Sequence, residues 1–232
     1  MTMLSWRVSD GWEVFASYSL LCENKPSLKF AFDIIKRDGC RCNDCGFTSR
    51  LSKKVPTGYM TVHPIEGDYL NRDIDRWHTL CPFCSSAKNV ISAMTTGDYK
   101  VVAAPWISQH ELFNVVRPLL CILSDPDHLY YAEALQSYKR IEASENSLAT
   151  LIPNIPDTEK TASLNIRKYF LLMDSVLTDE QYQQRSYIVD GLRLLPTKSY
   201  SSDEIDYWNQ AVYKNYPLSK WERLINWKKE QK

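Results

Sequence analysis

The clearest pattern of apolar and polar positions lies in the middle of the chain. After Ser108, apolar residues recur at the one- and three-residue steps that keep side chains on one face of a helix: Leu112, Val115, Val116, Leu119, Leu120 and Leu123. Ser108 and Glu111 have the spacing of a capping box, in which each side chain bonds the other's backbone N–H. Pro118 lies inside the pattern and should kink the helix or remove one hydrogen bond. The stretch predicts an amphipathic helix packed on a core.

A second helix is predicted nearer the start of the chain, over residues 26–38. It carries Leu28, Phe32 and Ile35 on one face, and Gly39 suits the residue after a helix end, where the backbone turns left-handed. Strands are indicated by β-branched and aromatic runs at 59–63 and 99–103, the first followed by a turn region around 64–67. Residues 6–15 predict a hairpin around an Asp-Gly turn.

The other segments have mainly helical signals. Further helices are predicted at 82–94, 128–143, 163–177, 179–190 (capped by Thr178, with Gln181 at the third position), 203–214 (capped by Ser201 or Ser202) and from 219 onward, with a loop at 146–160. The order of elements predicts an α+β fold with a mainly helical C-terminal half. We expect one region at 1–104 and a helical region at 105–232 packed on it, as one compact domain.

Four cysteines form two C-x2-C pairs: Cys42 with Cys45, and Cys81 with Cys84, separated by 35 residues. Such a pair forms a tight turn, or knuckle, in which two thiolates converge on one cation. Two knuckles supply the tetrahedral set of four sulfurs that a structural zinc ion accepts without an open water position. The pattern predicts one structural zinc ion held by Cys42, Cys45, Cys81 and Cys84.

The other interpretations of these cysteines are weaker than a zinc site. A redox C-x-x-C needs one pair rather than two, and unrelated buried thiols seldom show this spacing. Cys40 offers a further thiolate beside the first knuckle and can replace Cys42 in a mutant, although Cys42 has the standard spacing. His78 competes as a ligand only if the four sulfurs leave a position open. Cys22 and Cys121 are expected to be buried thiols.

Composition narrows the class of protein. The 232 residues carry zero formal net charge, so they lack the basic excess typical of nucleic-acid binding. No apolar run approaches the roughly 20 residues that span a bilayer, and no signal peptide is recognisable. Ligand-like cysteines favour a reducing compartment, so we expect a cytoplasmic protein. Seven Trp and fourteen Tyr are many, and those in the last quarter suit either helix packing or a partner interface.

The arrangement of helix, cysteine knuckle, β-rich insert and second knuckle opening a helix resembles the ββα-metal core of HNH nucleases. In family members with four cysteines the zinc is structural, and a second metal in the insert carries out catalysis. That second site needs an Asp-His pair, an Asn, and a His or Asn after the last cysteine. Here Val62-His63 replaces Asp-His, Asn71 matches the Asn, and Ser85 and Ser86 follow Cys84. Nearby Asp68, Asp73 and Asp75 do not have the motif's spacing. The resemblance predicts a degenerate, inactive nuclease scaffold.

Ordered blocks along most of the chain, up to about residue 196, also resemble the IcmJ (DotN) family of Dot/Icm-type type IVB secretion components, which itself looks HNH-like. They are Trp6-Arg7, Lys36-Arg37-Asp38, Cys42 to Phe47 with Arg50-Leu51, Gly67-Asp68-Tyr69 with Asn71, Cys81-Pro82-Phe83-Cys84, Ser108 to Leu112, and Arg193-Leu194-Leu195-Pro196. The segment after 197 lies outside the resemblance and is a candidate extension.

The family resemblance implies a non-enzymatic adaptor subunit of the type IV coupling complex. Such a subunit binds the C-terminal extension of the coupling-protein ATPase at the cytoplasmic face of the inner membrane and supports effector recruitment. Its contact with the membrane is indirect, and no nucleic acid is expected. The alternative hypothesis is a metal-dependent HNH-like nuclease or DNA-processing protein that uses His63 and Asn71. A DNA-binding zinc module without catalysis is disfavoured by the neutral charge.

Overall fold

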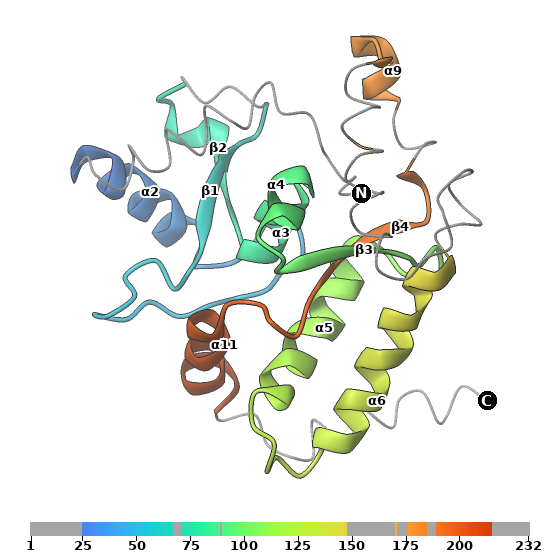
Figure 1. The fold of residues 1–232 in the computed structure, drawn as a ribbon. Helices are drawn as coiled ribbons and strands as arrows, with labels where there is room; N and C mark the ends of the chain where they lie inside the picture. The colour runs from blue at the N-terminus through green and yellow to red at the C-terminus, as the bar shows by residue number, and fades with distance from the viewer. Residues whose placement is uncertain are drawn as a thin grey trace.

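The computed structural model describes residues 25–66, 71–88, 90–147, 170, 176–184 and 189–214. These residues form a mixed α+β fold with seven α-helices and two small antiparallel sheets of two strands each, which confirms the predicted class (Figure 1). None of the helices among them combines the length and the apolar character needed to cross a bilayer. The predicted hairpin at 6–15, most of the helix at 163–177 and the helix from 219 lie outside the described residues, as does most of the predicted loop at 146–160.

The first layer consists of α2 (Lys25–Arg37) packed on a hairpin of β1 (Thr61–Pro64) and β2 (Trp77–Leu80), side by side in Figure 1. Gly39 follows the helix with φ +63°, as predicted. The buried face of α2 is Ile34 and Ile35, with Phe30 edge-on to Trp77. The predicted position of Leu28 on the core face is wrong, since its side chain is 46% exposed. The helix is rotated so that residues 30, 31, 34 and 35 meet the sheet.

The residues at the end of α2 attach it to β2. Arg37 donates hydrogen bonds to the carbonyl oxygens of Ile74 and Trp77, both at 2.6 Å, and Asp38 accepts one from the Thr79 N–H at 2.9 Å. Arg37 also pairs with Asp38 at 2.8 Å. Although burial opposes the charged form, hydrogen bonds from Arg37 and Thr79 lower the pKa of the Asp38 carboxyl. Charged groups that bond strand carbonyls and amides hold the first knuckle, which follows directly, against the hairpin.

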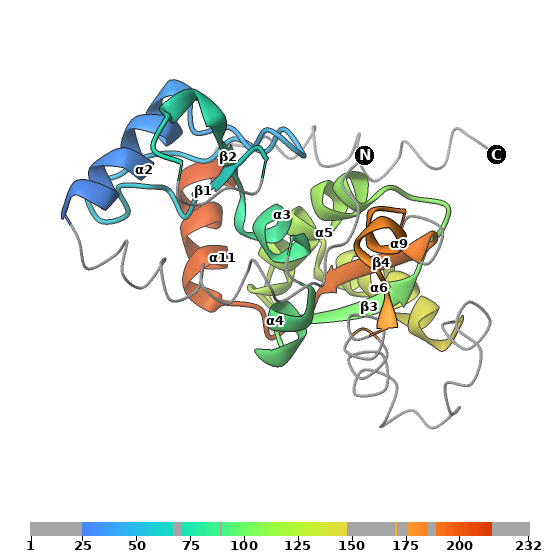
Figure 2. The same ribbon diagram turned by 90° about the horizontal axis from the view of Figure 1, so that it is seen from above.

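After the hairpin the chain forms α3 (Pro82–Ala87) and α4 (Val90–Thr95) and then β3 (Tyr99–Ala103). The helix predicted over 82–94 is thus present as two short helices, the first ending at Ala87 and the second beginning at Val90. The strand predicted at 99–103 is confirmed with the same bounds. Figure 2 shows α3 between the hairpin and α5. The side chain of Phe83, on α3, is buried in the core.

The partner of β3 is β4 (Leu192–Pro196), a strand that the sequence patterns did not predict. The two are antiparallel, with Val101 opposite Leu194. Every residue of β4 is buried, so no alternation of polar and apolar positions marks it as a strand. The outer edge of β4 is closed by the buried side chain of Gln109, which donates to the Leu194 carbonyl and accepts from the Leu194 N–H, both at 2.8 Å. The amide side chain thus pairs with the backbone N–H and C=O at this edge, as a neighbouring strand would.

Two antiparallel helices, α5 (Gln109–Leu123) and α6 (Tyr131–Glu142), pack beside this sheet (Figure 1). The capping box of Ser108 and Glu111 is confirmed, and Pro118 lies inside α5. Leu112, Val116 and Leu120 are buried as predicted, but Val115 is 43% exposed. The face of α5 that enters the core is centred on Phe113, Arg117 and Cys121, so it includes a charged side chain.

The last described elements are α9 (Asp179–Gln183), with its predicted capping box of Thr178 and Gln181, and α11 (Ser202–Trp208), continued by a π-helical turn at Asn209–Tyr213. Trp208 of α11 is fully buried and makes ring contacts with Phe47, Phe83 and Tyr200. Tyr200 donates to the carboxyl of Glu204. One core cluster thus contains residues from α2 to α11 and lies on both sides of the boundary predicted at 104.

Candidate metal centre

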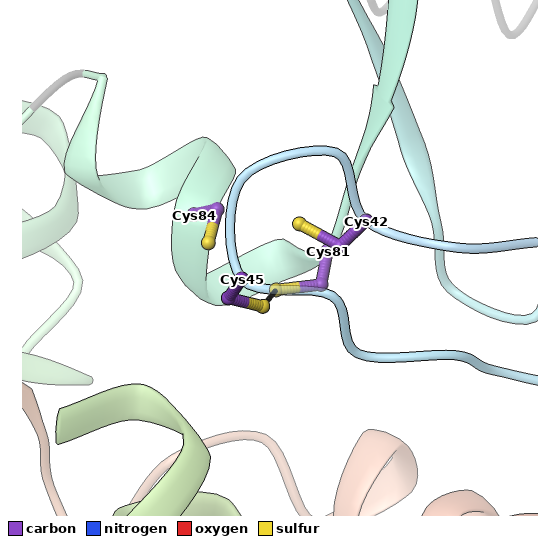
Figure 3. A group of neighbouring side chains, drawn as sticks. All are labelled: Cys42, Cys45, Cys81 and Cys84. Carbon is purple, nitrogen blue, oxygen red and sulfur yellow. Dashed lines mark hydrogen bonds between the residues drawn. The ribbon is translucent and has the colours of Figure 1, made fainter. Parts of the chain in front are cut away.

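The first knuckle is shaped by backbone hydrogen bonds in the loop after α2. The Cys42 N–H donates to the Phe47 carbonyl at 2.8 Å, and the Gly46 N–H donates to the Cys42 carbonyl at 2.9 Å. Gly46 has φ +74°, a left-handed conformation that costs glycine little. The Asn43 N–H donates to the Thr79 carbonyl, so the knuckle is tied to β2. These bonds shape the loop that carries Cys42 and Cys45, which Figure 3 shows beside Cys81 and Cys84.

The second knuckle is built by the junction of β2 and α3. Cys81 is the residue before α3, Pro82 is its first residue, and the Ser85 N–H donates to the Cys81 carbonyl at 2.9 Å. Proline suits this first helical position because it has no N–H to leave unpaired. Cys84 then lies one turn along from Cys81. The hairpin and α3 thereby bring the second pair of sulfurs to the first.

The structure brings all four predicted ligands together. The sulfurs of Cys42, Cys45, Cys81 and Cys84 lie within 4.8 Å of one another, and those of Cys45 and Cys81 are 3.6 Å apart (Figure 3). A tetrahedral ion with metal–sulfur bonds of about 2.3 Å holds its sulfurs about 3.8 Å apart, whereas a disulfide brings them to about 2.05 Å. Cys42, Cys81 and Cys84 are buried and Cys45 is half-buried. The four cysteines can hold a metal ion.

The electrostatics of this cluster favour a cation. Hydrogen bonds from the three neighbouring thiols, together with the positive charge of Arg117, lower the pKa of Cys45. Burial raises the pKa of Cys81. Four sulfurs this close cannot all become thiolates without a positive charge among them, because like charges oppose ionisation. A bound dication removes that conflict.

Cys40 lies outside the cluster. Its backbone is left-handed, with φ +57°, and its thiol donates to the Thr57 carbonyl at 3.8 Å. Cys121 is buried on α5, as predicted, and burial raises the pKa of its thiol to about 12. Cys22 lies outside the described residues. Of the six cysteines in the part of the chain that the structure describes, the four of the two C-x2-C pairs are therefore brought together.

Arg117 is the residue beside the cluster that sequence reasoning missed. Its side chain is 1% exposed, and its Nη2 lies 3.1 Å from the Cys81 sulfur and 3.9 Å from that of Cys45. Asn114, one turn earlier, accepts from Arg117 Nη1 at 3.4 Å and donates to the Cys45 carbonyl at 3.0 Å. The signal in the sequence was a charged residue amid the apolar positions of this helix.

A second set of donor groups adjoins the first. Asp44, Cys84 and His110 have donor atoms within 4.8 Å of one another. The same Asp44 oxygen, however, lies 3.3 Å from Lys88 Nζ and 4.0 Å from His110 Nε2. Lys88 already supplies Asp44 with a positive charge, and Cys84 belongs to the four-sulfur set.

The residues of the predicted nuclease motif do not assemble a metal site. His63 on β1 faces Ser85 on α3, with Nε2 and Oγ 2.9 Å apart. Val62 is buried, and the Asn71 side chain accepts from the Asp73 N–H. Neither group of metal donors among the described residues includes His63. Burial lowers the pKa of His63 to about 3.

No protein-family model matches the chain, and no curated protein matches it. Function is therefore inferred from the geometry of the four-cysteine cluster and from the sequence blocks.

Proposed function

We propose that the chain is a non-enzymatic, zinc-stabilised adaptor subunit of a type IVB secretion coupling complex. The observation that carries this proposal is the closed cluster of four cysteine sulfurs, held by two knuckles and buried between the hairpin, α3 and α5. Four thiolates fill a tetrahedral zinc ion and leave no position for a reactive water, which is the arrangement of structural sites. Iron also accepts four sulfurs, so metal analysis has to distinguish them.

The absence of a catalytic role is supported by the surroundings of His63. The consecutive order of β1, β2 and α3 supports the resemblance to the HNH core, and His63 faces the first residue after Cys84. That residue is Ser85, and the residue before His63 is the buried Val62, so neither neighbour is the metal ligand that nuclease catalysis uses. A histidine whose pKa is lowered to about 3 is also a weak proton acceptor at neutral pH.

The proposed partner is the C-terminal extension of the coupling-protein ATPase, on the cytoplasmic side of the inner membrane. The partner rests on the resemblance of the ordered blocks to the IcmJ family. Large exposed apolar side chains suit such a role, and Trp106 and Leu129 are 68% and 71% exposed.

The test is an affinity purification of the tagged full-length protein from its own cells, with metals and associated proteins both quantified. We expect the coupling ATPase and about one zinc per chain, the number that one four-thiolate site predicts. If the metal analysis finds one iron ion per chain, the metal of the proposal is iron and not zinc. Recovery of nucleic acid, or of no protein partner, would overturn the adaptor role.

The second candidate is the HNH-like nuclease, and the position of His63 between the hairpin and α3 is the observation in its favour. Plasmid nicking with magnesium or manganese that is lost in His63→Ala, and retained in His128→Ala, would support it. His128 is a suitable control because it precedes α6, and its Nδ1 accepts from the Tyr130 N–H. We expect no nicking with either metal.

A further inference from the structure

Arg117 occupies an unusual place for an arginine. It lies in the middle of α5 with its guanidinium 3.8 Å above the centre of the Phe47 ring, and 4.9 and 5.4 Å from the rings of Phe83 and Trp208. These rings come from the first knuckle, from α3 and from α11. Aromatic faces attract a guanidinium, but they supply no negative charge. The rings fix the plane of the group and exclude water from it.

A buried guanidinium needs an anion, and the anion here is sulfur. Among the described residues, no carboxylate forms an ion pair with Arg117, and its nearest acceptor is the sulfur of Cys81. Arginine stays protonated in proteins even when it is buried, so the guanidinium of Arg117 carries a positive charge beside the Cys81 sulfur. A divalent ion with four thiolates has a net charge of −2, and one guanidinium compensates half of it.

The contact is directed to two of the four sulfurs. The Nη2 atom reaches Cys81 and Cys45, and Asn114 connects the same guanidinium to the Cys45 backbone. Cys45 is the least buried of the four cysteines, so it is the sulfur that a small electrophile reaches first. A hydrogen bond from a cation holds the lone pairs of a thiolate and makes it a poorer nucleophile.

We propose that Arg117 is the counter-ion of the metal centre and that it protects the Cys45 and Cys81 thiolates from electrophilic attack. This inference rests on the proposed metal site, which the same experiment examines first. Arg117 acts through the ligands rather than on the metal, so it is a positioning residue. The alternative is that Arg117 only fills space between α5 and α11.

The test compares the purified full-length protein with Arg117→Met, Arg117→Lys and the control Arg193→Met. Arg193 is the other buried arginine of the described residues and donates to the Ile107 and Leu192 carbonyls, away from the cysteines. Each protein is treated with iodoacetamide, from which a thiolate displaces iodide and forms a carbon–sulfur bond. Peptide mass spectrometry then gives the rate at each cysteine, and metal content is measured before treatment.

We expect the ratio of the Cys45 rate to the Cys42 rate to rise about tenfold in Arg117→Met, the factor expected from the loss of one charge-assisted hydrogen bond. Arg117→Lys should fall between this variant and the wild type, because lysine keeps the charge without the planar fork. The ratio within one molecule separates this effect from unfolding, which exposes both cysteines alike. In cobalt-substituted protein, the sulfur-to-metal charge-transfer band should move to lower energy in Arg117→Met.

Two different results would overturn the proposed metal site and the proposed role of Arg117. Wild-type protein that holds no metal would refute the metal site itself, and with it the role of Arg117. Wild-type protein that holds one metal, with the same rate ratio and cobalt spectrum in Arg117→Met as in Arg193→Met, would refute the role of Arg117 alone.

Discussion

Replacing Cys81 with serine should destabilise the protein far more than the same replacement of another buried cysteine. Cys81 is fully buried, 3.6 Å from the Cys45 sulfur and 3.1 Å from Arg117. A neutral hydroxyl is a poor replacement for a thiolate ligand of a soft metal site. The variant therefore loses the metal and leaves the guanidinium of Arg117 without its nearest anion.

The expected loss of stability follows from the buried charge of Arg117. Removing one partner of a buried ion pair costs about 3–5 kcal/mol, because the other charge remains uncompensated. The lost free energy of metal binding adds to this cost. The control is Cys40→Ser, which changes a thiol that is 6% exposed and bonded only weakly to the Thr57 carbonyl. We expect this control to cost about 1 kcal/mol.

Urea unfolding, followed by far-ultraviolet circular dichroism, measures both variants against the wild type, with zinc counted per chain. Domains of ordinary stability have a free energy of unfolding of about 5–15 kcal/mol, so Cys81→Ser should lose a large part of this free energy. The reasoning would be refuted if the two variants lost similar amounts of stability. It would also be refuted if Cys81→Ser retained one metal per chain.

Three further predictions concern other residues. Cys42→Ser should hold well under one zinc per chain, because the left-handed backbone of Cys40 directs its thiol away from the cluster. Burial raises the pKa of Glu204 from its ordinary value of 4.5 to about 7, so stability should fall as the pH rises between these values. Glu204→Gln should abolish that fall and gain up to about 3 kcal/mol above pH 7, measured by urea unfolding across pH 5–8.5. Gln109→Leu should cost about 3 kcal/mol in the same assay, because it leaves the buried N–H and C=O of Leu194 unpaired.

Features set by neighbouring residues were predictable from the sequence. The capping boxes that begin α5 and α9 depend on two residues three positions apart, and both are present. The left-handed Gly39 ends α2 as its position suggests. The C-x2-C spacing likewise predicted which cysteines would meet, because each pair is a local turn and the ligand geometry of a metal leaves few ways to combine two turns.

Features that depend on distant partners were not predictable in this way. The strand β4 has no alternating pattern, and its partner β3 lies about 90 residues earlier in the chain. The rotation of α2 that exposes Leu28 is set by the hairpin rather than by the helix. The burial of Arg117 is also tertiary in origin, because its anions come from two knuckles and its rings from three segments. In a pattern of apolar positions, an arginine appears as an interruption. Here the arginine lies at the point where the helix packs against a charged group.

The four-cysteine cluster joins the two regions that the sequence suggested. All four sulfurs come from residues before 104, but the guanidinium beside them is on α5 and the Trp208 ring that covers it is on α11. The pairing of β3 with β4 adds a backbone connection across the same boundary. A fragment that ended at residue 104 would keep every ligand, but it would lose the counter-charge and one wall of the site. Because a cluster of thiolates is costly without nearby positive charge, the helical region contributes to the electrostatics of the four-cysteine cluster as well as to the core of the protein.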